Sequence, residues 1–178
     1  MTNLEDLETT DPETGQANAI IKSPQGSRNK FNYEPDRGLF RLGKVLPSGS
    51  VFPFDMGFLP STRGEDGDPL DVLVLMDEPV FPGCLVQARL IGAIEAEQTE
   101  RDGQTMRNDR LIAVAAVAQS HGSIKALAHL EDSTVTEIEQ FFVSYNTLAG
   151  KEFQPTGRGG PERAKKLVED GMRRHAQG

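Results

Sequence analysis

Three aspartates close together are the most chemically suggestive feature of the sequence. Asp66, Asp68 and Asp71 fall within six residues, and Asp71 opens the apolar run DVLVL. Carboxylates held on one short loop repel one another unless cations lie between them. Carboxylate oxygens are the ligands that Mg²⁺ prefers, and Mn²⁺ accepts the same ligand set. The spacing therefore predicts a divalent-metal site on a loop that leads into a buried strand.

Two other interpretations of this segment compete with the metal site. An EF-hand calcium loop requires glycine at its sixth position, where a loop counted from Asp66 has Asp71 instead. The pattern therefore argues against such a loop. A polar turn before a strand is the simpler alternative, because Asp, Gly and Pro are the commonest turn residues. Taken alone, the segment favours the turn, and the rest of the chain must decide.

Composition excludes several classes of function. The chain has a net charge of −8 and a pI near 4.9, whereas binding to a nucleic-acid backbone needs a cationic face. An oligonucleotide-binding barrel also needs stacking aromatic residues, and the sequence has no Trp and two Tyr. No stretch approaches the roughly 18 to 20 apolar residues of a membrane helix, and the acidic N-terminus lacks the parts of a signal peptide. We therefore expect a cytoplasmic protein without nucleic-acid or membrane partners.

Strand-like patterns fill the first two thirds of the chain. Between residues 19 and 118, short apolar runs such as CLVQARLIGAI and RLIAVAAVA alternate with turn signals such as PDRG and RDGQ. Strands at this spacing, with no helices between them, predict an antiparallel barrel or sandwich. Residues 1–17 show almost no periodic apolar signal. We expect them to form a mobile acidic segment ahead of one domain over residues 18–178.

A helix is expected where the period of the apolar residues changes. Apolar side chains recur at helical spacing from Val135 to Leu148. Thr134 and Glu137 have the spacing of a capping box, which would mark the start of this helix. Gly150 would mark its end, because glycine is common just after the last helical turn.

A second helix is expected near the end of the chain. Pro161 is a typical first helical residue. The predicted apolar face of this helix consists of Ala164, Leu167, Val168 and Met172. The glycine-rich residues 156–160 are interpreted as a mobile linker, since they lack the spacing of a known phosphate-binding loop. The expected fold class is mainly β or α+β, with a β-barrel core followed by packing helices.

Five blocks of sequence, in one order, resemble those of the soluble family I inorganic pyrophosphatases. The aspartate segment is similar to the family signature Asp-x-Asp-Pro-x-Asp before an apolar strand. The other four blocks are SPQGSRNKF at residues 23–31, VFPFDMGFLP at 51–60, NDRLIAV at 108–114 and FFVSY at 141–145. The resemblance covers about residues 19–150 and identifies the chain as a divergent member. It implies a five-stranded OB-like barrel with flanking helices, in agreement with the pattern above.

The same resemblance implies a Mg²⁺-dependent inorganic diphosphatase that hydrolyses pyrophosphate to two phosphates. Asp66 and Asp71 would bind the metal ions, with Mn²⁺ as an alternative to Mg²⁺. Asp68 would act as the general base that takes the proton of the attacking water. Four residues would bind the phosphate groups of the substrate: Lys30, Lys44, Arg110 and Tyr145. The resemblance also implies a homo-oligomer.

Four positions depart from the family pattern: Lys22, Met56, Asn108 and Asn146. Lys22 stands in place of a glutamate, and Asn108 stands in place of a metal-binding aspartate. The amide oxygen of Asn108 can still bind a hard cation, although it brings no negative charge. Glu97 lies within one residue of another metal-binding position and is a candidate replacement ligand. Two interpretations of these changes stay open: weaker binding of the outer metal ions, or a divergent branch of the family in which other residues fully compensate.

Three functions remain open at this level. The intact aspartates favour an active pyrophosphatase, because clustered carboxylates are destabilising without a use. The four departures favour a catalytically impaired paralogue that binds phosphate-bearing ligands or a protein partner. An active enzyme could also accept a larger phosphoanhydride, since Met56 and Asn146 change the expected pocket.

Overall fold

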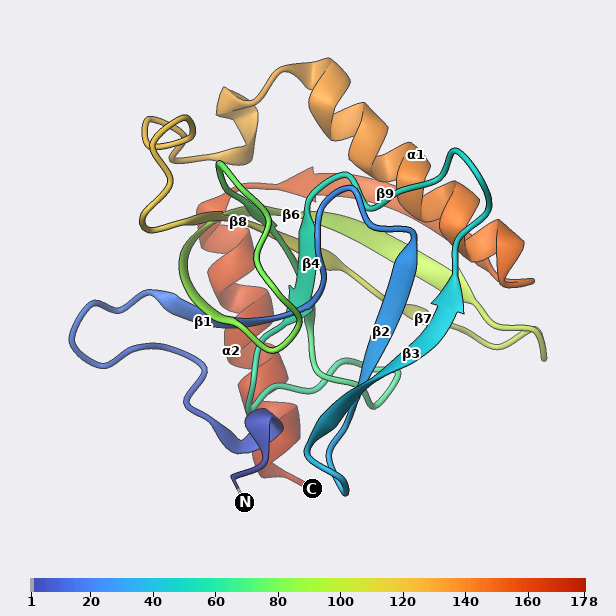
Figure 1. Ribbon diagram of the computed structural model, residues 1–178, viewed down its shortest axis with the longest axis horizontal. Coiled ribbons are helices and arrows are strands. Elements are labelled where there is room, and N and C mark those ends of the chain that lie inside the picture. The colour runs from blue at the N-terminus through green and yellow to red at the C-terminus, as the bar shows by residue number, and fades with distance from the viewer. Residues whose placement is uncertain (1) are drawn as a thin grey trace.

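The computed structural model describes residues 2–178, and its centre is a closed ring of five strands (Figure 1). The ring consists, in order, of β1 (Ala17–Ser23), β4 (Asp55–Phe58), β5 (Asp71–Leu75), β8 (Arg110–Ala115) and β6 (Leu85–Thr99). β6 pairs with β1 again, which closes the ring. Neighbouring strands run antiparallel except β5 and β8, which run parallel. This arrangement confirms the predicted five-stranded barrel.

The ring strands are apolar because the barrel interior and the covering elements bury both of their faces. Every residue of β8 is buried, and β5 is buried after its first residue. Gly57 shows how tightly two of these strands pass. A Cβ atom at Gly57 would lie 2.1 Å from the carbonyl oxygen of Ile20, so a side chain cannot fit there. The long β6 bends through register shifts, which lets it contact four other strands.

Four strands lie outside the ring. β2 (Asn29–Glu34) and β3 (Leu39–Val45) form a separate hairpin, while β7 (Thr105–Arg107) and β9 (Glu152–Gly159) pair with β6. The mobile linker predicted for residues 156–160 is therefore wrong for most of that segment. Its glycine-rich backbone adds to the free edge of β6, and these backbone hydrogen bonds fix a segment whose side chains give no strand signal.

Two α-helices cover the ring, as predicted. The first helix, α1 (Asp132–Leu148), begins two residues before Thr134. The predicted capping box at Thr134 is wrong, because the Thr134 N–H already donates to the Glu131 carbonyl oxygen. Gly150 follows the helix with a φ of 75°, the left-handed conformation expected at a helix end.

The second helix, α2 (Pro161–Ala176), begins at the predicted proline. Ala164, Leu167 and Val168 are buried as expected. Met172 is 40% exposed, so it lies at the border of the apolar face, and Gly171 is buried one residue before it. A Cβ atom at Gly171 would collide with Leu70, which shows how closely α2 packs on the loop before β5.

The N-terminal segment contacts the barrel at several points. Thr9 is buried and donates to the Pro60 carbonyl oxygen at 2.9 Å, and the Leu4 N–H donates to the Tyr33 hydroxyl at 3.0 Å. The segment also contains η1 (Leu4–Asp6), and η2 (Leu127–His129) precedes α1. The mobility expected of residues 1–17 stays a prediction, and the first of them lies outside the described residues. Among residues 2–178, no helix is long and apolar enough to cross a membrane.

Candidate functional site

A cavity of about 550 Å³ lies between the ring, the β2–β3 hairpin and the end of α1. We call it the main cavity. It brings together eight of the nine residues that the sequence predicts for the site: Lys30, Lys44, Asp66, Asp68, Asp71, Asn108, Arg110 and Tyr145. The departures Lys22, Met56 and Asn146 line it as well. The ninth predicted residue, Glu97, is not among the lining residues.

The loop before β5 holds two of the aspartates by local hydrogen bonds. Gly67 has a φ of 88°, which a glycine adopts without strain and which lets the chain reverse. The Asp68 N–H donates to Asp66 Oδ1 at 3.1 Å. At the end of the loop, the Leu70 N–H donates to the hydroxyl of buried Thr62 at 3.0 Å. The segment is thus a polar turn, as one interpretation of the sequence held, and this turn also carries the carboxylate cluster.

The parallel pairing of β5 with β8 explains the position of Asp71. Val72 is the register partner of Leu111, so the residues before them, Asp71 and Arg110, lie side by side at the same end of the pair. Arg110 Nη1 is 3.0 Å from Asp71 Oδ2, and Lys22 Nζ is 3.2 Å from Asp71 Oδ1. Burial raises the pKa of Asp71, but the charges of Lys22 and Arg110 outweigh it, and the pKa is lowered overall.

Arg110 is buried against two neighbouring aromatic rings. Its side chain is 4% exposed, and its guanidinium carbon lies 4.8 Å from the ring centre of Phe142 and 5.2 Å from that of Phe153. Nη1 also donates to Asn108 Oδ1, while Asn108 Nδ2 donates to Gln98 Oε1 at 2.9 Å. Nε is buried and has no hydrogen-bond partner among the residues described. This wall of the cavity therefore presents a fixed cation and two neutral amides.

The opposite side of the main cavity carries the basic residues of the hairpin. Lys30 and Lys44 are register partners on β2 and β3, and their Nζ atoms lie 5.6 Å and 4.5 Å from the ring centre of Tyr145. Burial, and then the charge of Lys22, lowers the pKa of Lys30. Burial, and then the charge of Lys30, lowers the pKa of Lys44. Burial, and then the charge of Asp71, raises the pKa of Tyr145 to about 12, so its hydroxyl keeps its proton at neutral pH.

Asp66 and Asp68 differ from Asp71 in having no ion-pair partner among residues 2–178. Loss of water around the Asp66 carboxylate raises its pKa, and the charges of Asp68 and Asp71 add to this effect. Their oxygens are hard donors open to the cavity, which fits Mg²⁺ or Mn²⁺. No group of three His, Cys, Asp or Glu side chains is arranged to hold a metal ion within the described chain. The third carboxylate of the cluster is instead turned towards Lys22 and Arg110.

Glu97 and its neighbour Gln98 show a register error in the sequence prediction. Glu97 lies opposite Arg107 on β7, and its side chain is exposed. Gln98 is 4% exposed, lines the main cavity and contacts Asn108. Successive strand side chains point to opposite faces, so the residue that faces Asn108 is Gln98. The structure does not bring Glu97 into the cavity.

Besides Gln98, four charged or amide residues of the lining were missed by the sequence analysis. Glu5, from the N-terminal segment, faces Asp68, and burial, then the charge of Asp68, raises its pKa. Glu100 and Lys151 form an ion pair of 2.8 Å at the opposite edge. Asn32 lies on β2, and the period-2 alternation from Lys30 could have identified it. The other three come from segments without a local pattern that signals the contact.

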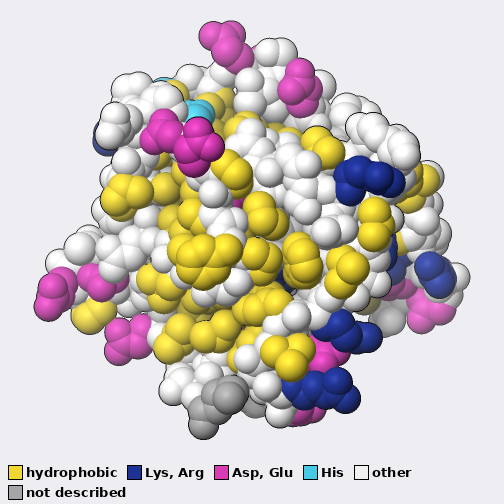
Figure 2. Space-filling model, in the orientation of Figure 1, with side chains coloured by type: hydrophobic (Ala, Val, Ile, Leu, Met, Phe, Trp, Pro, Cys, Tyr) yellow, Lys and Arg dark blue, Asp and Glu magenta, His cyan; other side chains and the backbone are white. Residues whose placement is uncertain are grey.

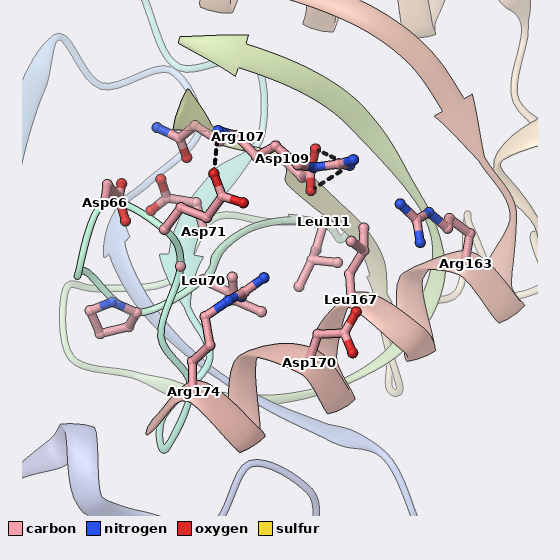
Figure 3. Close-up of a pocket in the computed structure, with 14 residues that line it drawn as sticks. Asp66, Leu70, Asp71, Arg107, Asp109, Leu111, Arg163, Leu167, Asp170 and Arg174 are labelled. Carbon is pink, nitrogen blue, oxygen red and sulfur yellow. Dashed lines mark hydrogen bonds and ion pairs between the residues drawn. The ribbon is translucent and has the colours of Figure 1, made fainter. Parts of the chain in front are cut away.

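A smaller cavity of about 140 Å³ lies next to the loop that carries Asp66 and Asp71, against α2 (Figure 3). Two of the arginines that line it form ion pairs, one with Asp109 of the same lining and one with Glu95 outside it. Arg163 contacts Glu95 at 2.7 Å, and Arg107 contacts Asp109 at 3.0 Å. Strand alternation places the side chains of Asp109 and Asn108 on opposite faces. Asp109 lines this second cavity, and its carboxylate is paired with Arg107. We interpret the paired charges as support for the loop.

Comparisons with known proteins point to one family. A sequence model of the family described as inorganic pyrophosphatase matches residues 19–176. The inorganic pyrophosphatase of Synechocystis is 37% identical over 159 residues, which cover 89% of this chain and 91% of that protein. The inorganic pyrophosphatase of Haloferax volcanii is 36% identical over 174 residues, with 97% and 96% covered.

A solved structure extends the agreement to the fold. The crystal structure of the inorganic pyrophosphatase from Thermus thermophilus superimposes with a TM-score of 0.88 and 34% sequence identity. The match covers 98% of this chain and 99% of that one. Family match, relatives and fold therefore coincide over nearly the whole chain, and together they show that it belongs to the inorganic pyrophosphatase family.

Proposed function

We propose that the chain hydrolyses inorganic pyrophosphate to two phosphates. The observation that carries this proposal is the division of the main cavity into two halves. Asp66 and Asp68, which have no ion-pair partner among residues 2–178, offer carboxylates on one side, while Lys30, Lys44 and Tyr145 offer cations and a hydroxyl on the other. Pyrophosphate is a small polyanion, and its hydrolysis needs both charge neutralisation and an activated water. The family and the names of the relatives support the same reaction.

The basic half of the cavity would hold the substrate. Lys30 and Lys44 would neutralise phosphate oxygens, and both sit against the ring of Tyr145, which limits their movement. The protonated hydroxyl of Tyr145 would donate a hydrogen bond to a phosphate oxygen. Arg110 would face the same oxygens from the other wall, and its fixed guanidinium costs little entropy on binding.

The acidic half would activate the water. We assign Asp68 as the general base that accepts the proton of the attacking water, while the water oxygen bonds to phosphorus and the bridging P–O bond breaks. Asp66 would hold a divalent cation, Mg²⁺ with Mn²⁺ as a substitute, whereas both oxygens of Asp71 already contact Lys22 and Arg110. When bound, this ion supplies positive charge that acidifies water. The Asn108 oxygen is a further candidate ligand, whereas Glu97 has no part because its side chain lies outside the cavity.

Phosphate release tests the proposal. The purified protein with Mg²⁺ and pyrophosphate should release phosphate, and Asp68→Asn should lower the rate by about a hundredfold or more. The matched control is Asp36→Asn, because Asp36 is exposed in the β2–β3 turn away from the cavity. Absence of phosphate release by the unmodified protein would contradict the proposal. Parallel assays with tripolyphosphate and ATP define whether larger phosphoanhydrides are also substrates.

We also propose that the chain forms a homo-oligomer. Apolar side chains gather in the middle of the face that Figure 2 shows, where Figure 1 places the loop before β6. Phe81 in this loop is 70% exposed, and Leu85 at the start of β6 is 46% exposed. Exposed apolar patches of this kind are typical of protein interfaces. The cytoplasmic location and the lack of nucleic-acid partners, expected from composition, stay predictions.

A further inference from the structure

Asp71 is the carboxylate of the cluster that already has its counter-charges. Lys22 Nζ approaches one of its oxygens at 3.2 Å, and Arg110 Nη1 approaches the other at 3.0 Å. The Asp71 side chain is 18% exposed and that of Lys22 is 22% exposed, so solvent screens this ion pair only in part. Asp66 and Asp68 have no such partners among the residues described. The three carboxylates are therefore not equivalent towards a metal ion.

The residues around Asp71 offer a divalent ion few additional ligands. Arg110 is restrained by burial and by the contacts of its guanidinium with Phe142 and Phe153. The amide oxygen of Asn108 accepts from Arg110, and the oxygen of Gln98 accepts from Asn108. Each of these two amide oxygens therefore already accepts one hydrogen bond inside the wall and has one lone pair left for a cation. Lys22 is the mobile partner, since it reaches Asp71 through a flexible side chain.

We infer that the Lys22 ammonium group is a built-in cation that takes the place of a divalent ion at Asp71. The cavity then binds fewer metal ions than its three carboxylates could hold. A metal ion at this carboxylate must either displace Lys22 or lie beside two protein cations, and both arrangements are electrostatically unfavourable. The inference rests on the proposed function, which makes the cavity a metal-using site. It gives a structural cause for weaker binding of the outer metal ions, one of the two interpretations left open by the sequence.

Counting bound Mn²⁺ on the purified protein without substrate tests this inference. Lys22→Met keeps the length of the side chain and removes its charge. We expect this variant to bind one more Mn²⁺ per chain than the unmodified protein, or to bind its last ion about tenfold more tightly. Lys166→Met, an exposed lysine on α2, removes the same charge elsewhere and should leave the count and the affinities unchanged. Equal Mn²⁺ binding by Lys22→Met and the unmodified protein would overturn the inference.

Two further variants keep the test decisive if Lys22→Met unfolds. Lys22→Arg retains the positive charge, so this variant should bind Mn²⁺ as the unmodified protein does. A gain in Mn²⁺ binding by Lys22→Arg would contradict the inference. Asp71→Asn in the unmodified background should cost no bound ion, because protein cations already occupy that carboxylate. Loss of an ion in Asp71→Asn would overturn the inference independently. These tests measure Mn²⁺ binding and not turnover, so they can be interpreted even if the protein does not hydrolyse pyrophosphate. A failure of hydrolysis would count against the proposed function alone.

Discussion

Folding weakens the binding of a proton to the side chain of Lys30. Burial and the nearby charge of Lys22 lower its pKa below the usual value of 10.5. The folded state therefore binds this proton more weakly than the unfolded state does. The stability of the fold rises with pH between the folded-state pKa of Lys30 and 10.5, as the buried charge disappears. The same loss of charge removes a contact to phosphate from the proposed site.

Replacement of this lysine by arginine makes the effect measurable. We predict that the kcat/KM for pyrophosphate falls on the alkaline side at a pH below 10.5. In Lys30→Arg this fall should move to higher pH, because arginine keeps its proton throughout this range. The measurement is a pH profile of kcat/KM for both proteins. An unchanged alkaline limb in Lys30→Arg would show that another group controls it.

At the scale of single residues, the sequence predicted which residues belong to the site better than it predicted the contacts that these residues make. Asp66, Asp68 and Asp71 could be identified because their spacing is local and unusual. The ion pairs of Asp71 could not, because Lys22 and Arg110 lie on other strands, β1 and β8, and β4 stands between β1 and β5. Glu97 was named as a candidate ligand although its neighbour Gln98 lines the cavity, because one residue of register changes the face of a strand.

Among the elements, the contact between β1 and β4 makes the most stringent demand on a single position. A Cβ atom at Gly57 would lie 2.1 Å from the Ile20 carbonyl oxygen, which is backbone and cannot move aside. We predict that Gly57→Ala destabilises the protein by about 3 kcal/mol or more. Gly122→Ala is the control, because its Cβ would make ordinary contacts at 3.4 Å. Urea unfolding of both variants checks the difference, and equal midpoints would contradict it.

The elements themselves were largely predictable. The barrel strands follow from their apolar runs, and α2 begins at Pro161 because proline fits the first helical turn. The strand β9 was missed because its residues, EFQPTGRG, carry no alternation and depend on backbone pairing with β6. The start of α1 was misplaced because its first residues have no side-chain cap to mark them.

At the scale of the whole molecule, the apolar face around Phe81 is a candidate surface for binding a second copy. We predict that Phe81→Glu lowers the oligomeric state, because it would bury a charge in an apolar interface. Sedimentation analysis of the unmodified protein and the variant measures this. Leu148→Glu, which changes an exposed leucine at the end of α1, should keep the original state. Unchanged sedimentation of Phe81→Glu would place the interface elsewhere.

The enclosure of Arg110 has a consequence for the order in which the site is completed. The two rings that grip its guanidinium belong to α1 and β9, which follow the last ring strand in the chain. During synthesis, a chain that stops short of Phe142 already carries the acidic loop and the whole barrel sequence. We expect such a chain to lack the two aromatic rings that hold the Arg110 guanidinium beside Asp71. Catalytic activity should therefore appear only after α1 and β9 have been added to the barrel.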